Sequence, residues 1–175
     1  KPNKELELAN IRSSGVVTRL WFAVDNHGGA MTLANDACKD PLFLRKTVLQ
    51  IFWEDSDFPS VNVPLGDFFG VGHGKVSNYS SALLEMTVNP ADKGNFRGSF
   101  ISWIQMPFQK AARFVIRNDS EELIRVFWHI DYQKWHSLPA DAYYFHSNWR
   151  CEQPCKSVPL LPSGKEGANL TGENN

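Results

Sequence analysis

Hydrophobic residues in this chain come in short runs, in which β-branched and aromatic side chains alternate with polar ones. In the segment 112–117, for example, Phe114 and Ile116 fall on one side of an extended strand, while two arginines fall on the other. Clusters of Gly, Pro, Asn and Asp separate the runs, a pattern typical of strands and turns. Eight strands are predicted: Val16–Val24, Thr47–Trp53, Val61–Pro64, Ala82–Val88, Gly98–Ile104, Ala111–Arg117, Leu123–Tyr132 and Ala142–Trp149.

This strand content predicts an all-β fold, and the uneven loops favour a jelly-roll β-sandwich. The alternative is an immunoglobulin-like sandwich, but the Cys and Trp landmarks of that fold are missing. A length of 175 residues suits one domain. We place the jelly-roll domain at residues 1–155 and expect a linker or flexible tail at 156–175, where Pro, Gly and Asn are frequent.

The overall composition narrows the classes of function. The chain is 42% hydrophobic with a net charge of -1, which argues against disorder and against electrostatic binding to nucleic acid. No apolar run approaches the roughly 20 residues that cross a bilayer, so no membrane partner is expected. The glycine pattern at 70–74 lacks the Lys-Ser/Thr ending of a phosphate loop, and no Cys/His set has zinc spacing. We therefore expect no metal and no cofactor.

Cysteines and glycosylation sequons bear on the compartment. Cys151 and Cys155 are close enough in sequence for a disulfide, although two free thiols are an equal alternative. The sequons at Asn78, Asn118 and Asn169 shift the balance toward a secreted, glycosylated protein that carries the disulfide. Cys38 is then left unpaired.

Residues 51–74 form the segment richest in acids and aromatics. A sugar site needs aromatic faces for stacking and charged groups for hydroxyls, and this segment supplies both. In the alternative interpretation Phe68 and Phe69 fill the core, and the acids Glu54, Asp55 and Asp57 form a solvated turn. A second aromatic segment ends the domain, where His146 is most simply a structural residue. The candidate sugar-binding residues are Trp53, Asp67, Phe68, Phe69, His146 and Trp149.

Six motifs occur in order along the chain. They are Gly15–Phe22, Leu49–Glu54, Pro59–Gly70, Met106–Phe108, Ile130–Tyr132 and Phe145–Arg150. Together they resemble glycoside hydrolase family 172, formerly a domain of unknown function, and the similarity runs from about residue 12 to residue 150. The resemblance implies a protomer of two jelly rolls, of which this chain would be the N-terminal one, and a homo-oligomer that is a trimer or larger. It also implies retaining hydrolysis of fructofuranosides or arabinofuranosides by two glutamates.

The resemblance places the catalytic glutamates after the matched region, outside this chain, so it carries no catalytic residue over. It supports the six candidate residues as walls of a sugar pocket. Two other functions stay open: a jelly roll that binds glycan without cleaving it, and a structural assembly protein. If a second jelly-roll domain or chain covers part of this one, the isolated chain should expose that surface as an apolar patch. The candidates for the patch are Trp135, Trp149 and Phe108.

Overall fold

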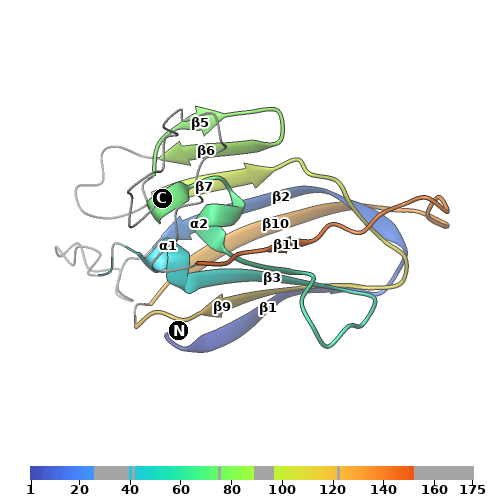
Figure 1. Cartoon of the computed structure of the whole chain (residues 1–175), viewed down its shortest axis with the longest axis horizontal. Coiled ribbons are helices and arrows are strands. Elements are labelled where there is room, and N and C mark those ends of the chain that lie inside the picture. Colours follow the sequence, from blue (N-terminus) through green and yellow to red (C-terminus); the bar gives the residue numbers. More distant parts are fainter. Residues whose placement is uncertain (26–39, 41, 75, 89–96, 122, 152–175) are drawn as a thin grey trace, which may run out of the picture.

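Two β-sheets pack face to face in the computed structural model, which describes residues 1–25, 40, 42–74, 76–88, 97–121 and 123–151 (Figure 1). Sheet A contains five strands in the order β1-β9-β3-β4-β11. All its neighbours are antiparallel except β11, which runs parallel to β4. The strands are β1 (Lys4–Ile11), β9 (Ala112–Asn118), β3 (Thr47–Trp53), β4 (Val61–Pro64) and β11 (Ser147–Asn148).

Sheet B contains six strands and is antiparallel throughout. The long strand β2 is paired with β10 along one side; on its other side it meets β7 and then β8. Beyond β7 follow β6 and β5. The strands are β10 (Arg125–Lys134), β2 (Gly15–Asp25), β7 (Arg97–Ser102), β6 (Leu84–Val88), β5 (Tyr79–Ser80) and β8 (Met106–Phe108).

The chain crosses repeatedly between the two sheets. It passes from β1 to β2, back to β3 and β4, across to β5–β8, and back again to β9. As a result β1, β9 and β3 lie side by side in sheet A, while β2 lies beside β7 in sheet B. The all-β jelly-roll sandwich expected from the sequence is confirmed.

The predicted strands agree best where an apolar run is continuous. The expected bounds of β3 and β4 match the structure. Nearly every side chain of these two strands is buried, which is why their sequences are mostly apolar. The last prediction, Ala142–Trp149, is wrong in length: only Ser147–Asn148 forms a strand. Three strands were missed. They are β1, most of whose side chains are exposed, and the short β5 and β8.

The core fills the space between the sheets. Its largest fully buried side chains come from both sheets and from the loops that close them, so no single strand dominates it. At the sandwich margin the indole nitrogen of Trp128 on β10 donates to the carbonyl oxygen of Leu8 on β1 at 3.1 Å. The fully buried rings include Phe22, Phe69, Phe100, Phe108 and Phe114.

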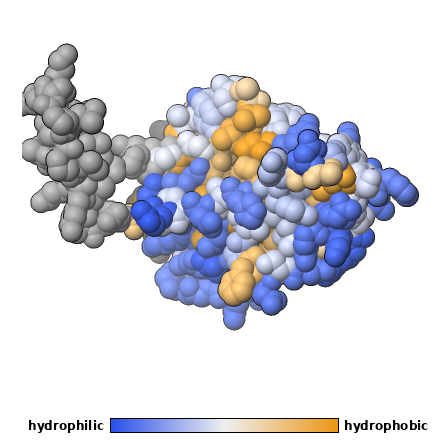
Figure 2. Space-filling model, turned by 45° about the vertical axis from the view of Figure 1, so that its right-hand side comes forward, coloured by the Kyte–Doolittle hydropathy of each residue, from blue (hydrophilic) through white to orange (hydrophobic). Residues whose placement is uncertain are grey.

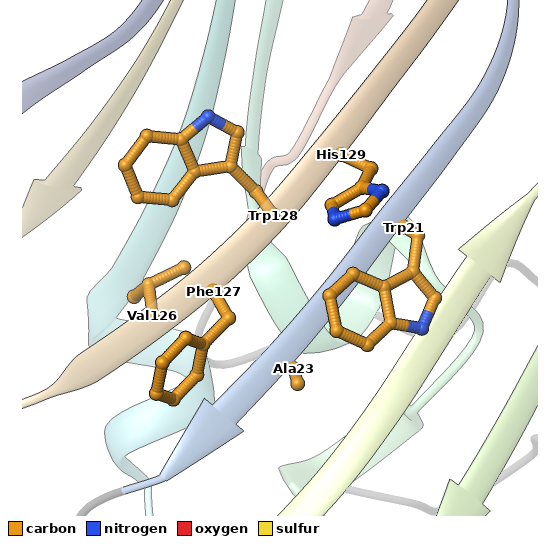
Figure 3. A pocket seen from close by; sticks show the side chains of 6 residues that line it. All are labelled: Trp21, Ala23, Val126, Phe127, Trp128 and His129. Atoms are coloured by element: carbon orange, nitrogen blue, oxygen red, sulfur yellow. The ribbon is translucent and has the colours of Figure 1, made fainter.

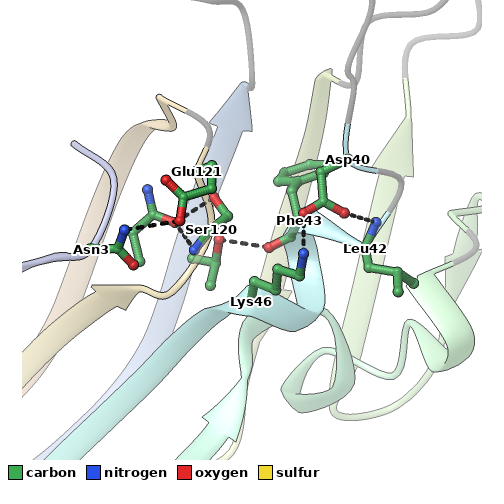
Figure 4. Close-up of polar contacts among 9 residues, drawn as sticks. Asn3, Asp40, Leu42, Phe43, Lys46, Ser120 and Glu121 are labelled. Carbon is green, nitrogen blue, oxygen red and sulfur yellow. Dashed lines mark hydrogen bonds and ion pairs between the residues drawn. The ribbon is translucent and has the colours of Figure 1, made fainter.

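Short helices close one end of the sandwich. They are α1 (Phe43–Lys46), α2 (Leu65–Phe68) and the 3-10 turn η1 (Gly72–Gly74), and α1 and α2 lie close together in Figure 1. Asp40 accepts hydrogen bonds from the backbone of Leu42 and from the Lys46 ammonium, at 2.9 and 2.6 Å (Figure 4). Burial acts to raise the pKa of Asp40, but these bonds outweigh it and hold the pKa below its usual value.

The surface is mostly hydrophilic, with apolar patches set into it on the face that Figure 2 presents. Several large hydrophobic side chains are exposed, among them Phe127 and Trp103. Among the described residues, no helix has the length and apolarity that a bilayer crossing requires.

Candidate functional site

Three of the predicted sugar-binding rings lie in the core. Trp53, Phe68 and Phe69 are only 3%, 7% and 0% exposed. Trp53 stacks on Phe108 at 6.2 Å between ring centroids, and its indole nitrogen donates to the carbonyl oxygen of Phe145 at 2.8 Å. Their faces therefore meet protein, and the alternative interpretation, that these rings fill the sandwich, fits their placement. The reason is position: β3 is central in sheet A, and α2 turns both phenylalanines inward.

Two other predicted residues, Asp67 and Trp149, meet through a residue that the sequence did not single out. The guanidinium of Arg45, at the end of α1, donates to one carboxylate oxygen of Asp67 at 2.9 Å. The same guanidinium lies 5.5 Å from the ring centroid of Trp149. We call Arg45, Asp67 and Trp149 the end cluster. It combines a carboxylate, a guanidinium and an exposed indole.

The end cluster holds polar atoms that lack partners within the described part of the chain. The second carboxylate oxygen, Oδ2 of Asp67, is buried without a hydrogen bond, and so is Nε of Arg45. Buried polar groups are normally paired, so two unpaired atoms in one cluster are unusual. The side chain of Asp67 is 14% exposed and that of Arg45 is 28% exposed. The cluster is therefore partly sheltered but still reachable.

His146 lies just before β11 and is exposed. Its neighbour Phe145 faces inward, where its ring packs against Phe68 at 6.2 Å. The aromatic segment before Trp149 thus alternates, with one ring anchored in the core and the histidine in solvent.

The predicted glycosylation sites differ in exposure. Asn78 is exposed, with its side-chain oxygen accepting from the backbone of Val88 at 2.6 Å. Asn118 is 4% exposed, and its amide nitrogen donates to the carbonyl oxygen of Lys1 at 3.1 Å. A glycan on that nitrogen would break this bond, so the folded structure favours Asn78 over Asn118, and both stay predictions. Asn169 lies outside the described residues.

One cysteine of the predicted pair lies within the described residues. Cys151 is exposed and carries no disulfide. Its expected partner Cys155 lies outside the described residues, as does Cys38. Among the residues that are described, no group of three His, Cys, Asp or Glu side chains is placed to hold a metal ion.

The outer face of sheet B carries a second candidate site, which the sequence did not indicate. Trp21 on β2, Phe127 on β10 and Trp103 just after β7 all stand on this face, and the last two are 53% and 43% exposed. A hollow of about 400 Å³ lies here, and Figure 3 shows its side chains over β2 and β10. It is lined by Trp21, Ala23, Val126, Phe127, Trp128 and His129.

Polar side chains stand next to these rings. His129 meets Trp21 edge to face, with 5.2 Å between ring centroids. Arg19 donates to a carboxylate oxygen of Asp131 at 2.7 Å and also lies 5.7 Å from the ring centroid of Trp103. We call Phe127, Trp21 and Trp103 the aromatic row. Only the strand register could have revealed the row, because its members come from three distant parts of the sequence.

A comparison with models of protein families gives a match that is consistent with the fold. A model of the family described as GH172 domain-like matches residues 1–126, which is more than half of the chain. The chain belongs to the GH172 domain-like family. The GH172 match includes β1 to β9 and the start of β10, and therefore most of both sheets. Comparison with curated proteins gave no match.

Proposed function

We propose that this chain is the N-terminal jelly-roll half of a glycoside hydrolase that acts on fructofuranosides or arabinofuranosides. The catalytic glutamates would lie outside the chain. The family match over residues 1–126 carries the proposal, because it relates the jelly roll to a hydrolase family. The resemblance in the sequence motifs supplies the furanoside substrates and the retaining mechanism.

The ion pairs of the described residues involve aspartates, whereas the resemblance implies two catalytic glutamates. A retaining glycosidase needs two carboxyl groups about 5 Å apart, one as nucleophile and one as acid. Here five aspartates each pair with a cation, which suits structural or binding roles. The pairs are Arg12–Asp55, Arg19–Asp131, Arg45–Asp67, Lys46–Asp40 and Arg117–Asp119.

The end cluster is the contribution that we assign to this half of the furanoside site. The side chains of Asp67 and Arg45 are 14% and 28% exposed, so a carboxylate that accepts and a guanidinium that donates both reach the surface beside a bound sugar. The exposed ring of Trp149 offers an apolar face beside them. Together the three side chains have the chemistry of a sugar-pocket wall.

The proposed partner is a second jelly-roll domain or chain, within a homo-oligomer that is a trimer or larger. Of the three candidates for an uncovered patch, Trp135 and Trp149 are 40% and 41% exposed, whereas Phe108 is fully buried and drops out. We also propose that the protein is secreted, with Asn78 as its glycosylated residue and a disulfide at Cys151.

Intact mass of the native protein, reduced and non-reduced, tests the two-part architecture together with the disulfide and the glycan. We expect a longer polypeptide or a second chain in equal amount, and hydrolysis of furanosides by that material only. Hydrolysis by the 175-residue chain alone would contradict the proposal, as would native material that consists of this chain and no other.

A substitution in the complete enzyme tests the end cluster. Asp67→Asn should raise KM for furanosides about tenfold with a smaller effect on kcat, because it weakens binding outside the reacting centre. Asp119→Asn is the matched control, since it also loses a carboxylate paired with an arginine, on the surface. Equal effects of the two variants would remove the end cluster from the site.

A further inference from the structure

We propose that the aromatic row on the outer face of sheet B binds an extended chain of β-linked pyranose sugars. This site is separate from the furanoside site proposed above. The end cluster belongs to α1, α2 and the residue after β11, whereas the row belongs to β2, β7 and β10.

Strand register places the three rings on one diagonal. Phe127 stands opposite Ala23, and Trp21 lies two residues back along β2. Trp21 in turn stands opposite Ile101, and Trp103 lies two residues further along that side. Each step crosses one strand and moves two residues in the same sense, a separation of roughly 7–8 Å between backbone positions. The rings therefore form a straight row across three strands.

Polar groups lie along the row. His129 on β10 contacts the ring of Trp21. Arg19 on β2 pairs with Asp131 on β10 and also lies over the ring of Trp103. The ion pair is reachable from solvent, because its side chains are 32% and 47% exposed. Such groups supply the donors and acceptors that sugar hydroxyls need, while the rings supply the apolar faces.

The hollow between the first two rings gives the site depth. Its volume of about 400 Å³ falls within the range of small-molecule sites, and it is bounded by Trp21 and Phe127 with His129 on the same face (Figure 3). A six-membered sugar ring presents a broad C–H face that fits against an indole or phenyl ring. In an equatorially linked chain such faces repeat along a flat ribbon, which matches a straight row.

The charges on this face argue against nucleic acid. A single-stranded nucleic acid would also stack on aromatic rings, but it needs a positively charged groove for its phosphates. Here Arg19 is neutralised by Asp131. On the outer face of sheet A, by contrast, Phe52 is only 8% exposed and lies 3.8 Å below the guanidinium of Arg113.

Affinity electrophoresis tests the row directly. The 175-residue chain is run in native gels that contain soluble β-linked glucan, β-linked xylan or inulin. We expect retardation by the glucan or the xylan and none by inulin, whose sugars are furanoses. Phe127→Ala and Trp103→Ala should each weaken the retardation about tenfold, because each removes one stacking face.

Trp149→Ala is the matched control, because Trp149 has nearly the same exposure as Trp103, 41% against 43%, and lies in the end cluster. It should retain binding to the pyranose gels even if it impairs furanoside hydrolysis by the complete enzyme. Failure of one proposal can thus be told from failure of the other. Circular dichroism and melting temperature verify that each variant is folded.

Three results would overturn the proposal. The first is unchanged mobility of the wild-type chain in every gel, and the second is retardation by inulin alone. The third is a chain that elutes as a dimer and becomes monomeric in Phe127→Ala, without retardation by polysaccharide. That outcome would make the face a contact between copies of this chain.

Discussion

Two regions of this protein are rich in aromatic residues, and they use them in opposite ways. In the segment 53–70, Trp53, Phe68 and Phe69 are almost completely buried, although Phe58 between them is 80% exposed. In the aromatic row, Phe127 and Trp103 come from distant strands and are about half exposed. The first region holds the sandwich together, and the second presents rings to solvent.

The difference follows from how a sandwich is built. Sequence neighbours at the end of a strand are drawn inside together when a tight turn such as α2 closes the core. Residues that share an outer face must instead alternate along each strand and meet through register. Sequence neighbours such as Phe68 and Phe69 are therefore buried together, whereas the exposed row has to be assembled from several strands.

The largest effect is expected at the centre of the buried region. Phe69 is fully buried and contacts the rings of Phe22, Phe68 and Phe100. Phe69→Ala should lower the free energy of unfolding by about 3–5 kcal/mol, because it leaves a cavity in a packed core. Urea denaturation measures this. A loss below about 1 kcal/mol would show that the ring is not a core residue.

The turn after α2 should be nearly as sensitive. Gly70 has φ of +75°, and a Cβ there would lie 2.8 Å from the hydroxyl of Tyr79. Gly70→Ala should therefore cost about 1–3 kcal/mol of unfolding free energy. Gly72→Ala is the control, since a Cβ at Gly72 meets nothing within 4 Å. Chemical denaturation of both should separate them, and equal losses would argue against the turn described here.

The hydroxyl of Tyr79 gives the buried region a pH dependence. It donates to the carbonyl oxygen of Phe69, and burial raises the pKa of Tyr79 above its usual value of 10.0. The folded state therefore holds this proton more tightly, so its contribution is present below pH 10.0 and is lost as pH rises through the higher folded pKa. Between neutral and alkaline pH, the free energy of unfolding should fall less steeply for Tyr79→Phe than for the wild type. An identical fall in both would contradict this assignment.

The smallest effect on stability is expected in the row. Phe127 is 53% exposed on the edge strand β10. Phe127→Ala should change the free energy of unfolding by no more than about 0.5 kcal/mol, as exposed positions usually do. The melting temperature would then stay close to that of the wild type. A loss as large as that of Phe69→Ala would erase the contrast between the regions.

The sequence predicted the sandwich because its signals are local. The bounds of β3 and β4 were predicted to the residue, since both runs are rich in β-branched or aromatic residues and are almost fully buried. The sequence did not predict β1, because the segment has few β-branched or aromatic residues and its pairing with β9 is visible only in the structure. The strand predicted at 142–149 was too long, because its aromatic residues lie in an edge segment of which only Ser147–Asn148 forms a strand.

The candidate site was less predictable for the same physical reason. Asp67 and Trp149 were predicted from residue type, but Arg45, which joins them, carries no signal of its own in the sequence. Trp21 and Phe127 meet only because β2 and β10 pair in one particular register. Contacts of this kind depend on tertiary structure, which local pattern does not encode.

The most direct test of the central claim is an NMR titration that follows the indole N–H signals of the six tryptophans while a β-linked xylan or glucan oligomer is added. We expect the signals of Trp21 and Trp103 to shift in a saturable way. The buried Trp53 should stay unchanged. Shifts confined to Trp149, or no shift at Trp21 and Trp103 at saturating oligomer, would contradict the account.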